Sequence, residues 1–154
     1  MTGEPIRFLI VAGEASGDIH GGGLVRALKK NHSNCEFSGL GGDQMRREGV
    51  KTFYDIDRMG AVGVIEVLGD LPHYYKVYRK LSIEIGSGSY DAVILIDYPT
   101  LNLRLAKLCQ KHSCPALFFI SPQVWAWREN RIKKIKNYID EMAVIFPFET
   151  KYYT

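Results

Sequence analysis

Two acidic residues stand immediately after apolar segments, and they are the best candidates for proton-transfer chemistry. Asp97 directly follows the apolar run 92–96, and Glu14 follows the apolar run 8–12 after one glycine. A carboxylate at the mouth of a half-buried pocket can have a raised pKa, which lets it accept a proton from a hydroxyl group. We therefore take Asp97 as the first candidate for a general base and Glu14 as the second.

Both acids also have an ordinary structural interpretation. Aspartate is common before turns such as Tyr98-Pro99-Thr100, where its side chain caps the turn. Glu14 could equally be a charge at the start of a helix, because helix N-termini favour anions. The residues alone leave these alternatives open.

A third polar segment, residues 121–128, contains two tryptophans. Trp125 and Trp127 could stack on a sugar or pack against lipid chains, or they could fill the space between a sheet and a helix. The helix predicted next, over 128–138, is basic, and its face is either solvated or turned toward phosphate. Its charges are five positive and one negative, an excess of +4: Arg128, Arg131, Lys133, Lys134 and Lys136 against Glu129.

The glycine-containing segment 13–18 does not have the pattern of a nucleotide loop. Its sequence, Gly-Glu-Ala-Ser-Gly-Asp, is neither G-x-G-x-x-G nor a P-loop, which would need lysine where Asp18 stands. Its two carboxylates would also repel a phosphate. The four histidines pair with no cysteine or carboxylate at metal-ligand spacing, so we expect no metal and no cofactor.

Apolar runs that alternate with helical periodicity predict the elements that position these groups. Strands are expected at 8–12, 35–40, 50–54, 92–96, 115–120 and 142–146, with helices at 19–30, 43–48, around 74–85, around 101–108 and at 128–138. This order predicts an α/β fold with a doubly wound, Rossmann-like sheet of about six parallel strands. The loops 13–18, 97–100 and 121–128 would then meet at the carboxyl edge of the sheet.

Two further segments have features that the strand and helix pattern does not explain. Three consecutive glycines, 21–23, lie inside the first helix, and they indicate close approach by another backbone or a ligand, or else a frayed helix start. Residues 59–68 are apolar with a single charge. They are either a buried element or an exposed patch that binds protein or membrane.

Composition limits the broad class of the protein. The chain has 154 residues, 46% of them hydrophobic and 24% charged, and a net charge of +3, which predicts one domain with an ordinary core and no nucleic-acid partner. Three cysteines without a C-x-x-C pair favour a reduced, cytoplasmic compartment. No apolar run approaches ~18 residues, so we expect no membrane span. The last residues, 149–154, resemble the start of a further helix, and we expect the chain to be the front part of a longer protein.

Five segments, in order along the chain, together resemble the lipid-A-disaccharide synthase family. The string Ser-Pro-x-Val-Trp-Ala-Trp is highly specific, whereas each shorter motif alone would be weak. The segments are Val11–Asp18, the apolar stretch Val62–Leu68, Ile96-Asp97-x-Pro99, Ser121–Arg128 and Phe146-Pro147-Phe148-Glu149.

The resemblance implies an inverting glycosyltransferase of the GT-B fold that works, without a metal, as a peripheral protein at the cytoplasmic face of the inner membrane. The family joins UDP-2,3-diacylglucosamine to 2,3-diacylglucosamine 1-phosphate (lipid X), which forms the β-1,6-linked disaccharide and releases UDP. By position, Asp97 matches the general base for the acceptor 6-hydroxyl. The other residues expected to bind substrate are Glu14, Ser16, Gly17, Ser121, Gln123, Trp125, Trp127 and Arg128, and those expected at the membrane or acyl chains are Val62, Val64, Ile65, Val67 and Leu68.

The chain departs from the family in one motif and in length. The family often has Asp-x-Pro-Asp-Phe-Asn, whereas this chain has Asp97-Tyr98-Pro99-Thr100-Leu101-Asn102, so the second acid is absent. GT-B enzymes have two Rossmann-like domains. Residues 1–154 would be the acceptor-side domain, inactive until a nucleotide-sugar domain completes the cleft. The alternative is a stand-alone lipid-binding or interaction module without catalysis.

Overall fold

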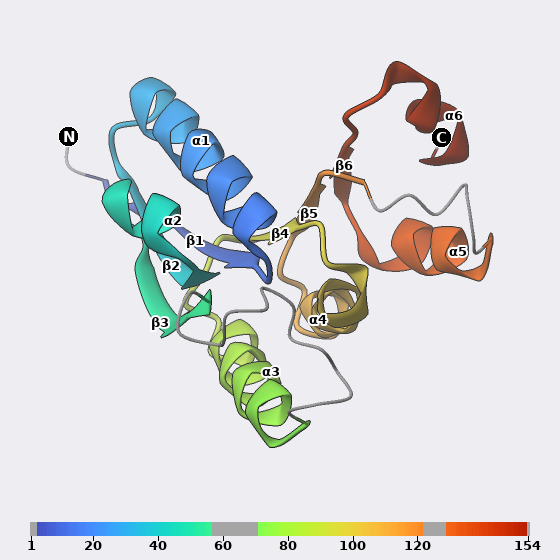
Figure 1. The fold of residues 1–154 in the computed structure, drawn as a ribbon, viewed down its shortest axis with the longest axis horizontal. Coiled ribbons are helices and arrows are strands. Elements are labelled where there is room, and N and C mark those ends of the chain that lie inside the picture. Colours follow the sequence, from blue (N-terminus) through green and yellow to red (C-terminus); the bar gives the residue numbers. More distant parts are fainter. Residues whose placement is uncertain (1–2, 57–70, 122–128, 154) are drawn as a thin grey trace.

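Residues 3–56, 71–121 and 129–153 are described by the structure, a computed structural model (Figure 1). Two groups of predicted site residues lie outside these ranges. They are Val62, Val64, Ile65, Val67 and Leu68 in the apolar stretch, and Gln123, Trp125, Trp127 and Arg128 in the tryptophan segment.

The described strands form one six-stranded parallel sheet, which confirms the predicted α/β, Rossmann-like fold. Their order across the sheet is β3-β2-β1-β4-β5-β6. The central strands β1 and β4 are largely apolar because helices cover both of their faces, and the one charged residue, Arg7, lies at the exposed start of β1. The strands are β1 (Ile6–Ala12), β2 (Cys35–Gly41), β3 (Lys51–Asp55), β4 (Ala92–Ile96), β5 (Ala116–Phe119) and β6 (Glu141–Ala143).

Helices lie on both faces of this sheet (Figure 1). Alternate side chains of β1 and β4 divide the core in two, as the period of two in a strand requires. Leu9 and Leu95 belong to the cluster that includes residues of α3, α4 and α5, whereas Ile10 and Ile96 pack with α1 and α2. The helices are α1 (Ala15–Asn31), α2 (Asp43–Arg47), α3 (Leu71–Gly86), α4 (Pro99–Lys111), α5 (Glu129–Tyr138), the 3-10 helix η3 (Pro147–Glu149) and α6 (Thr150–Tyr153).

The glycines of α1 allow α2 to pack closely against it. A Cβ at Gly21 would lie 2.7 Å from the sulfur of Met45, and one at Gly22 would lie 3.1 Å from the carbonyl oxygen of Gln44. Gly23 has nothing within 4 Å. The predicted close approach of another backbone is therefore confirmed at Gly22, where the neighbour is α2 of the same chain, whereas Gly21 packs against the Met45 side chain.

Two predicted boundaries are wrong. α1 begins at Ala15 rather than at residue 19, because Gly17 lets its first turn approach the sheet. β6 ends at Ala143 rather than at residue 146, because its partner β5 ends at Phe119 and Ile120 turns into the left-handed region with φ 70°. Beyond β6, Pro147 starts η3, and the helix expected near the last residues is α6.

Among the described helices, none has the length and apolar composition that crossing a membrane requires.

Candidate functional site

The carboxyl ends of β1, β4 and β5 lie next to one another at one edge of the sheet. Ala12 is in register with Ile96, and Ile96 is in register with Phe119, so the three strands end at the same level. Figure 1 shows the first turn of α1, in deep blue, beside the yellow turn that follows β4. β1 and β4 flank the position where the strand order reverses. This is where open α/β sheets bind their ligands.

Asp97 follows β4 in a strained backbone conformation. Asp97 has φ 46° and the next residue, Tyr98, has φ 44°, although neither is glycine. Each left-handed residue of this kind costs roughly 1–2 kcal/mol. Tyr98, not Asp97, occupies the N-cap position of α4 and makes no capping hydrogen bond with its side chain. Asp97 is therefore not the N-cap residue of α4, but its carboxyl interacts with the backbone N–H of Tyr98, and its role as a cap of the turn 98–100 stays a prediction.

The Asp97 carboxyl has an environment suited to proton transfer. Burial raises its pKa above the usual range for aspartate, while the backbone N–H of Tyr98 and the nearby imidazole of His20 oppose this shift. His20 belongs to α1 and is exposed. A carboxylate with a raised pKa binds a proton more tightly, so it is a stronger base for a substrate hydroxyl.

Glu14 lies on the opposite side of the switch point, at the N-cap position of α1. Its side chain makes no capping hydrogen bond. Burial raises its pKa first, and the negative charge of Asp97 raises it further. The structure therefore brings together the two acids that the sequence pointed to, and each sits where its charged form is disfavoured.

Asp18, the other acid of the first loop, faces away from this site. It is 4% exposed, and its carboxylate accepts hydrogen bonds from the backbone N–H groups of Gly42 (2.8 Å), Gln44 (2.9 Å) and Met45 (3.0 Å). These groups belong to the start of α2, whose unpaired N–H groups need an acceptor. Asp18 thus caps a helix 24 to 27 residues further along the chain.

The remaining predicted residues in the described ranges have different surroundings. Ser16 is exposed in the first turn of α1. Gly17 is buried, and a Cβ there would lie 3.3 Å from the Cβ of Ala12, so its visible role is close packing. Ser121 is 5% exposed, and its hydroxyl lies 2.5 Å from the hydroxyl of Tyr153. Among the predicted site residues that the structure describes, Glu14 is the one whose pKa is shifted by the charge of Asp97.

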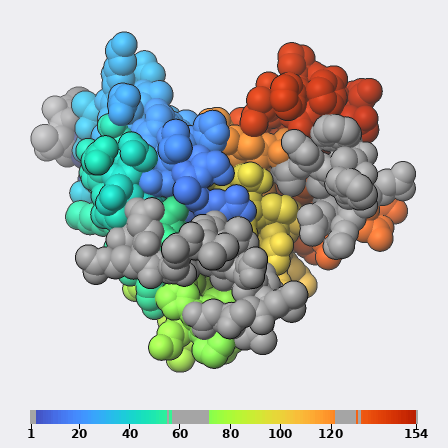
Figure 2. Space-filling model, in the orientation of Figure 1, coloured from blue at the N-terminus to red at the C-terminus, as the bar shows by residue number. Residues whose placement is uncertain are grey.

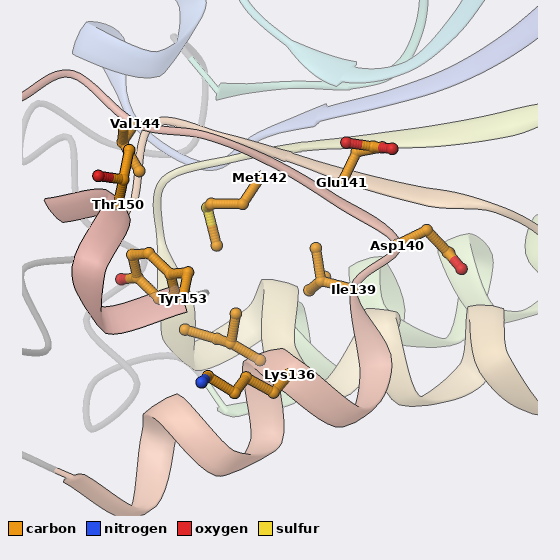
Figure 3. A pocket seen from close by; sticks show the side chains of 9 residues that line it. Lys136, Ile139, Asp140, Glu141, Met142, Val144, Thr150 and Tyr153 are labelled. Atoms are coloured by element: carbon orange, nitrogen blue, oxygen red, sulfur yellow. The ribbon is translucent and has the colours of Figure 1, made fainter. Parts of the chain in front are cut away.

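A separate pocket of about 490 Å³ lies between α5, β6 and α6 (Figure 3). Met142 and Tyr153 point into it, whereas the carboxylate of Asp140 points away. Asp97 and Glu14 are not among its lining residues.

Figure 2 shows a notch between α1, in blue, and α6, in red, so the molecule is hollowed between its first and last helices. The Ser121–Tyr153 hydrogen bond links the end of β5 to this side of the molecule.

Two residues that the sequence analysis did not select hold the turn after β4. Tyr98 is 6% exposed, and its ring occupies the space beside Gly13, where a Cβ would lie 2.7 Å away. Asn102 is fully buried, and its side-chain N–H groups donate to the carbonyl oxygens of Ile96 (3.1 Å) and Asp97 (2.6 Å). In the sequence, the signal that could have identified Asn102 is a single polar residue between the apolar residues Leu101 and Leu103.

Within residues 3–56, 71–121 and 129–153, no three histidine, cysteine or carboxylate side chains are grouped so that they could hold a metal ion. The chemistry that these residues support is general base catalysis by Asp97, with Glu14 as a neighbouring acid. Whether Ser16, Gly17 and Ser121 touch a ligand stays a prediction.

The doubly wound parallel sheet, with its acids at the switch point, places the chain among Rossmann-like α/β proteins. Its sequence narrows this class, because residues 8–154 match the family model described as lipid-A-disaccharide synthetase. The chain therefore belongs to the lipid-A-disaccharide synthetase family.

Three curated relatives illustrate the similarity, and each is named lipid-A-disaccharide synthase. The protein of Trichlorobacter lovleyi is 48% identical over 152 residues, which cover 99% of this chain and 40% of the relative. That of Geobacter sulfurreducens is 46% identical over 147 residues, covering 96% and 38%. That of Coxiella burnetii is 42% identical over 145 residues, covering 94% and 39%. The chain spans about 40% of the length of these relatives.

Proposed function

We propose that residues 1–154 form the acceptor-side domain of a glycosyltransferase that makes the lipid A disaccharide. The observation that carries this proposal is the family match along residues 8–154, which includes Asp97 at the carboxyl edge of the sheet. The donor would be UDP-2,3-diacylglucosamine and the acceptor lipid X. The donor side would come from a domain equivalent to the part of the relatives that this chain does not match, and we expect the chain alone to be inactive.

In the proposed reaction, Asp97 takes the proton from the acceptor 6-hydroxyl. The oxygen attacks the anomeric carbon of the donor sugar, the new β-1,6 bond forms, and the bond to UDP breaks on the opposite face. The half-buried position of Asp97 supports this role, because burial raises its pKa and strengthens it as a base. The step needs no metal and no other cofactor.

Glu14 would contribute by its charge and position rather than as a second base. Its pKa is raised partly by Asp97, so the two carboxylates disfavour each other's charged forms. A hydrogen bond to a sugar hydroxyl would relieve this repulsion when substrate is present. Ser16, Gly17 and Ser121 are proposed as further contacts, together with Gln123, Trp125, Trp127 and Arg128. The membrane and acyl-chain surface of Val62, Val64, Ile65, Val67 and Leu68 is proposed on the resemblance alone.

The test uses a chimera in which residues 1–154 replace the matching residues of the Trichlorobacter lovleyi relative. With radiolabelled donor and lipid X, the chimera should form disaccharide and UDP. Asp97→Asn should lower kcat by about 10²–10⁴-fold, because a general base contributes about that much. Glu36→Gln is the matched control, since Glu36 is an exposed acid at the amino end of β2.

Equal rates for Asp97→Asn and the unmodified chimera would exclude Asp97 as the base. An inactive but folded chimera, combined with binding of lipid X vesicles by the isolated chain in the absence of donor, would instead favour the stand-alone lipid-binding module.

A further inference from the structure

The carboxyl end of β4 carries three consecutive carbonyl groups that a single residue binds. The side chain of Asn102 donates to the carbonyl oxygens of Ile96 and Asp97 at 3.1 Å and 2.6 Å. The backbone N–H of Asn102 donates to the carbonyl oxygen of Tyr98 at 3.1 Å. Asn102 thus fixes the orientation of the peptide groups on both sides of Asp97.

The turn needs such a restraint because its backbone is intrinsically unfavourable. Asp97 and Tyr98 have φ values of 46° and 44°, a region that non-glycine residues seldom adopt in succession. Strained conformations of this kind persist only where the surrounding structure over-determines them. Here two contacts restrain the turn. The Asn102 side chain binds its carbonyl oxygens, and the Tyr98 ring packs beside Gly13.

The chemistry of the asparagine side chain fits this task closely. Holding two carbonyl oxygens takes two donors on one atom, and the amide nitrogen supplies both. Aspartate would place a carboxylate against those oxygens, and leucine would leave both oxygens unbound. The Asn102 Oδ1 atom is buried and has no hydrogen-bond partner among the described residues. Of the Asn102 amide, therefore, the two N–H donors form hydrogen bonds in the described structure, and the buried oxygen does not.

We propose that Asn102 is a positioning residue for Asp97: by holding the carbonyl oxygens of Ile96 and Asp97 with its side chain, it keeps the left-handed turn and so directs the Asp97 carboxyl toward the switch point of the sheet. The inference rests on the proposed function in that Asp97 is taken as the base. It adds a residue that touches neither substrate nor reacting atom.

The first measurement uses the chain itself. The pKa of the Asp97 carboxyl, followed by the carbon-13 shift of its side chain, should move toward the ordinary aspartate value in Asn102→Ala, since the carboxyl leaves its half-buried position. Val50→Ala, a buried substitution at the amino end of β3, serves as a control for loss of stability. Glu14 and His20, the charged neighbours of Asp97, are titrated alongside it.

The second measurement uses the chimera with the Trichlorobacter lovleyi relative. Asn102→Ala should lower kcat about 10²-fold, because a displaced catalytic group loses about this factor. The KM for lipid X should change less than about 3-fold, and the acidic limb of the kcat pH profile should shift with the pKa of Asp97. Val50→Ala should leave both unchanged. Identical kcat and pH profiles for the two variants would overturn the inference.

The outcomes separate this inference from the proposed function. If the unmodified chimera makes no disaccharide, the proposed function fails, and the Asp97 pKa still decides whether Asn102 positions the carboxyl. If Asn102→Ala does not fold, hydrogen exchange in the unmodified chain decides. The side-chain N–H groups of Asn102, bonded to the carbonyl oxygens of Ile96 and Asp97, should exchange far more slowly than those of the exposed Asn31, and equally rapid exchange would overturn the inference.

Discussion

The turns after β1 and β4 lie side by side, and each follows a strand whose last five residues are apolar and is followed closely by an acid, yet the chain builds them differently. After β1, the backbone enters α1 directly, and Asp18 turns inward to bind three N–H groups of α2. After β4, two left-handed residues delay the start of α4, and Asp97 stays half-buried at the sheet edge. One acid stabilises the fold, and the other is held in a position that disfavours its charge.

This difference separates structural acids from chemical ones. The Asp18 carboxylate accepts three backbone N–H bonds and is 4% exposed, so it is held inside the fold and is poorly accessible to a substrate. A carboxylate with a raised pKa and a single backbone N–H neighbour keeps its affinity for protons. Strain, too, is present in only one of the two turns. The contrast between Asp18 and Asp97 therefore supports the proposal that the proton transfer takes place on the β4 side of the switch point.

The largest effect on stability is expected from Asp18→Ala. Three N–H groups at the start of α2 would lose a charged acceptor, and the free energy of unfolding should fall by about 3 kcal/mol. For a chain of this size, the melting temperature should drop by ~10 °C. Asp43→Ala is the control, because Asp43 is an exposed acid on the same helix, and it should cost about 0.5 kcal/mol or less. Thermal unfolding of both variants gives the answer, and equal losses would refute the capping role.

A smaller effect is expected from Gly13→Ala, which tests how the two turns depend on each other. The new Cβ would lie 2.7 Å from the Tyr98 ring, and displacing that ring should cost about 1–2 kcal/mol. Gly23→Ala is a matched control that should raise, rather than lower, the free energy of unfolding. Nothing lies within 4 Å of its Cβ, and alanine in a helix should stabilise the chain by ~0.5–1 kcal/mol. Denaturant unfolding compares the two, and a stabilising Gly13→Ala would show that the turns are independent.

The smallest effect is expected in the pH dependence of stability. The folded pKa of Asp97 is raised, so its contribution to stability is present below the unfolded pKa of about 4 and is lost as pH rises through the folded pKa. Asp97→Asn removes this loss. As pH rises from about 4 through the folded pKa of Asp97, the free energy of unfolding of the variant should therefore increase relative to that of the wild type. At higher pH the difference should stay constant.

Urea unfolding from pH 3 to pH 8 measures this difference. Glu36→Gln, an exchange at an exposed acid that pairs with Arg7, is measured alongside as the control. A difference that moves in favour of the wild type as pH rises would mean that Asp97 is stabilised as an anion, contrary to its half-buried position.

The sequence predicted most of the fold because its elements are locally encoded. Short apolar and mixed runs bounded by turn residues predicted all six strands, with the end of β6 misplaced, and helical spacing predicted the main helices. The errors fell where a neighbour decides the boundary. The start of α1 depends on how closely Gly17 meets Ala12, and the end of β6 depends on where β5 stops.

The candidate site was only partly predictable. Asp97 and Glu14 could be identified because acids after apolar strands must gather at one edge of a parallel sheet. The role of Asp18 could not be read from its spacing, since its partners lie 24 to 27 residues away. Ser121 meets Tyr153 across 32 residues of chain. The restraint by Asn102 was also hidden, because left-handed backbone at Asp97 and Tyr98 carries no glycine to signal it.

The sequence by itself determined the doubly wound sheet, the edge at which chemistry gathers and the family to which the motifs point, because periodicity and ordered motifs are properties of the chain. Only the tertiary structure decided that Asp18 caps a helix, whereas Asp97 has a strained backbone and a carboxyl with a raised pKa. Burial, hydrogen-bond partners and backbone strain at one residue are set by segments far away in the sequence, and these segments meet only in the folded molecule.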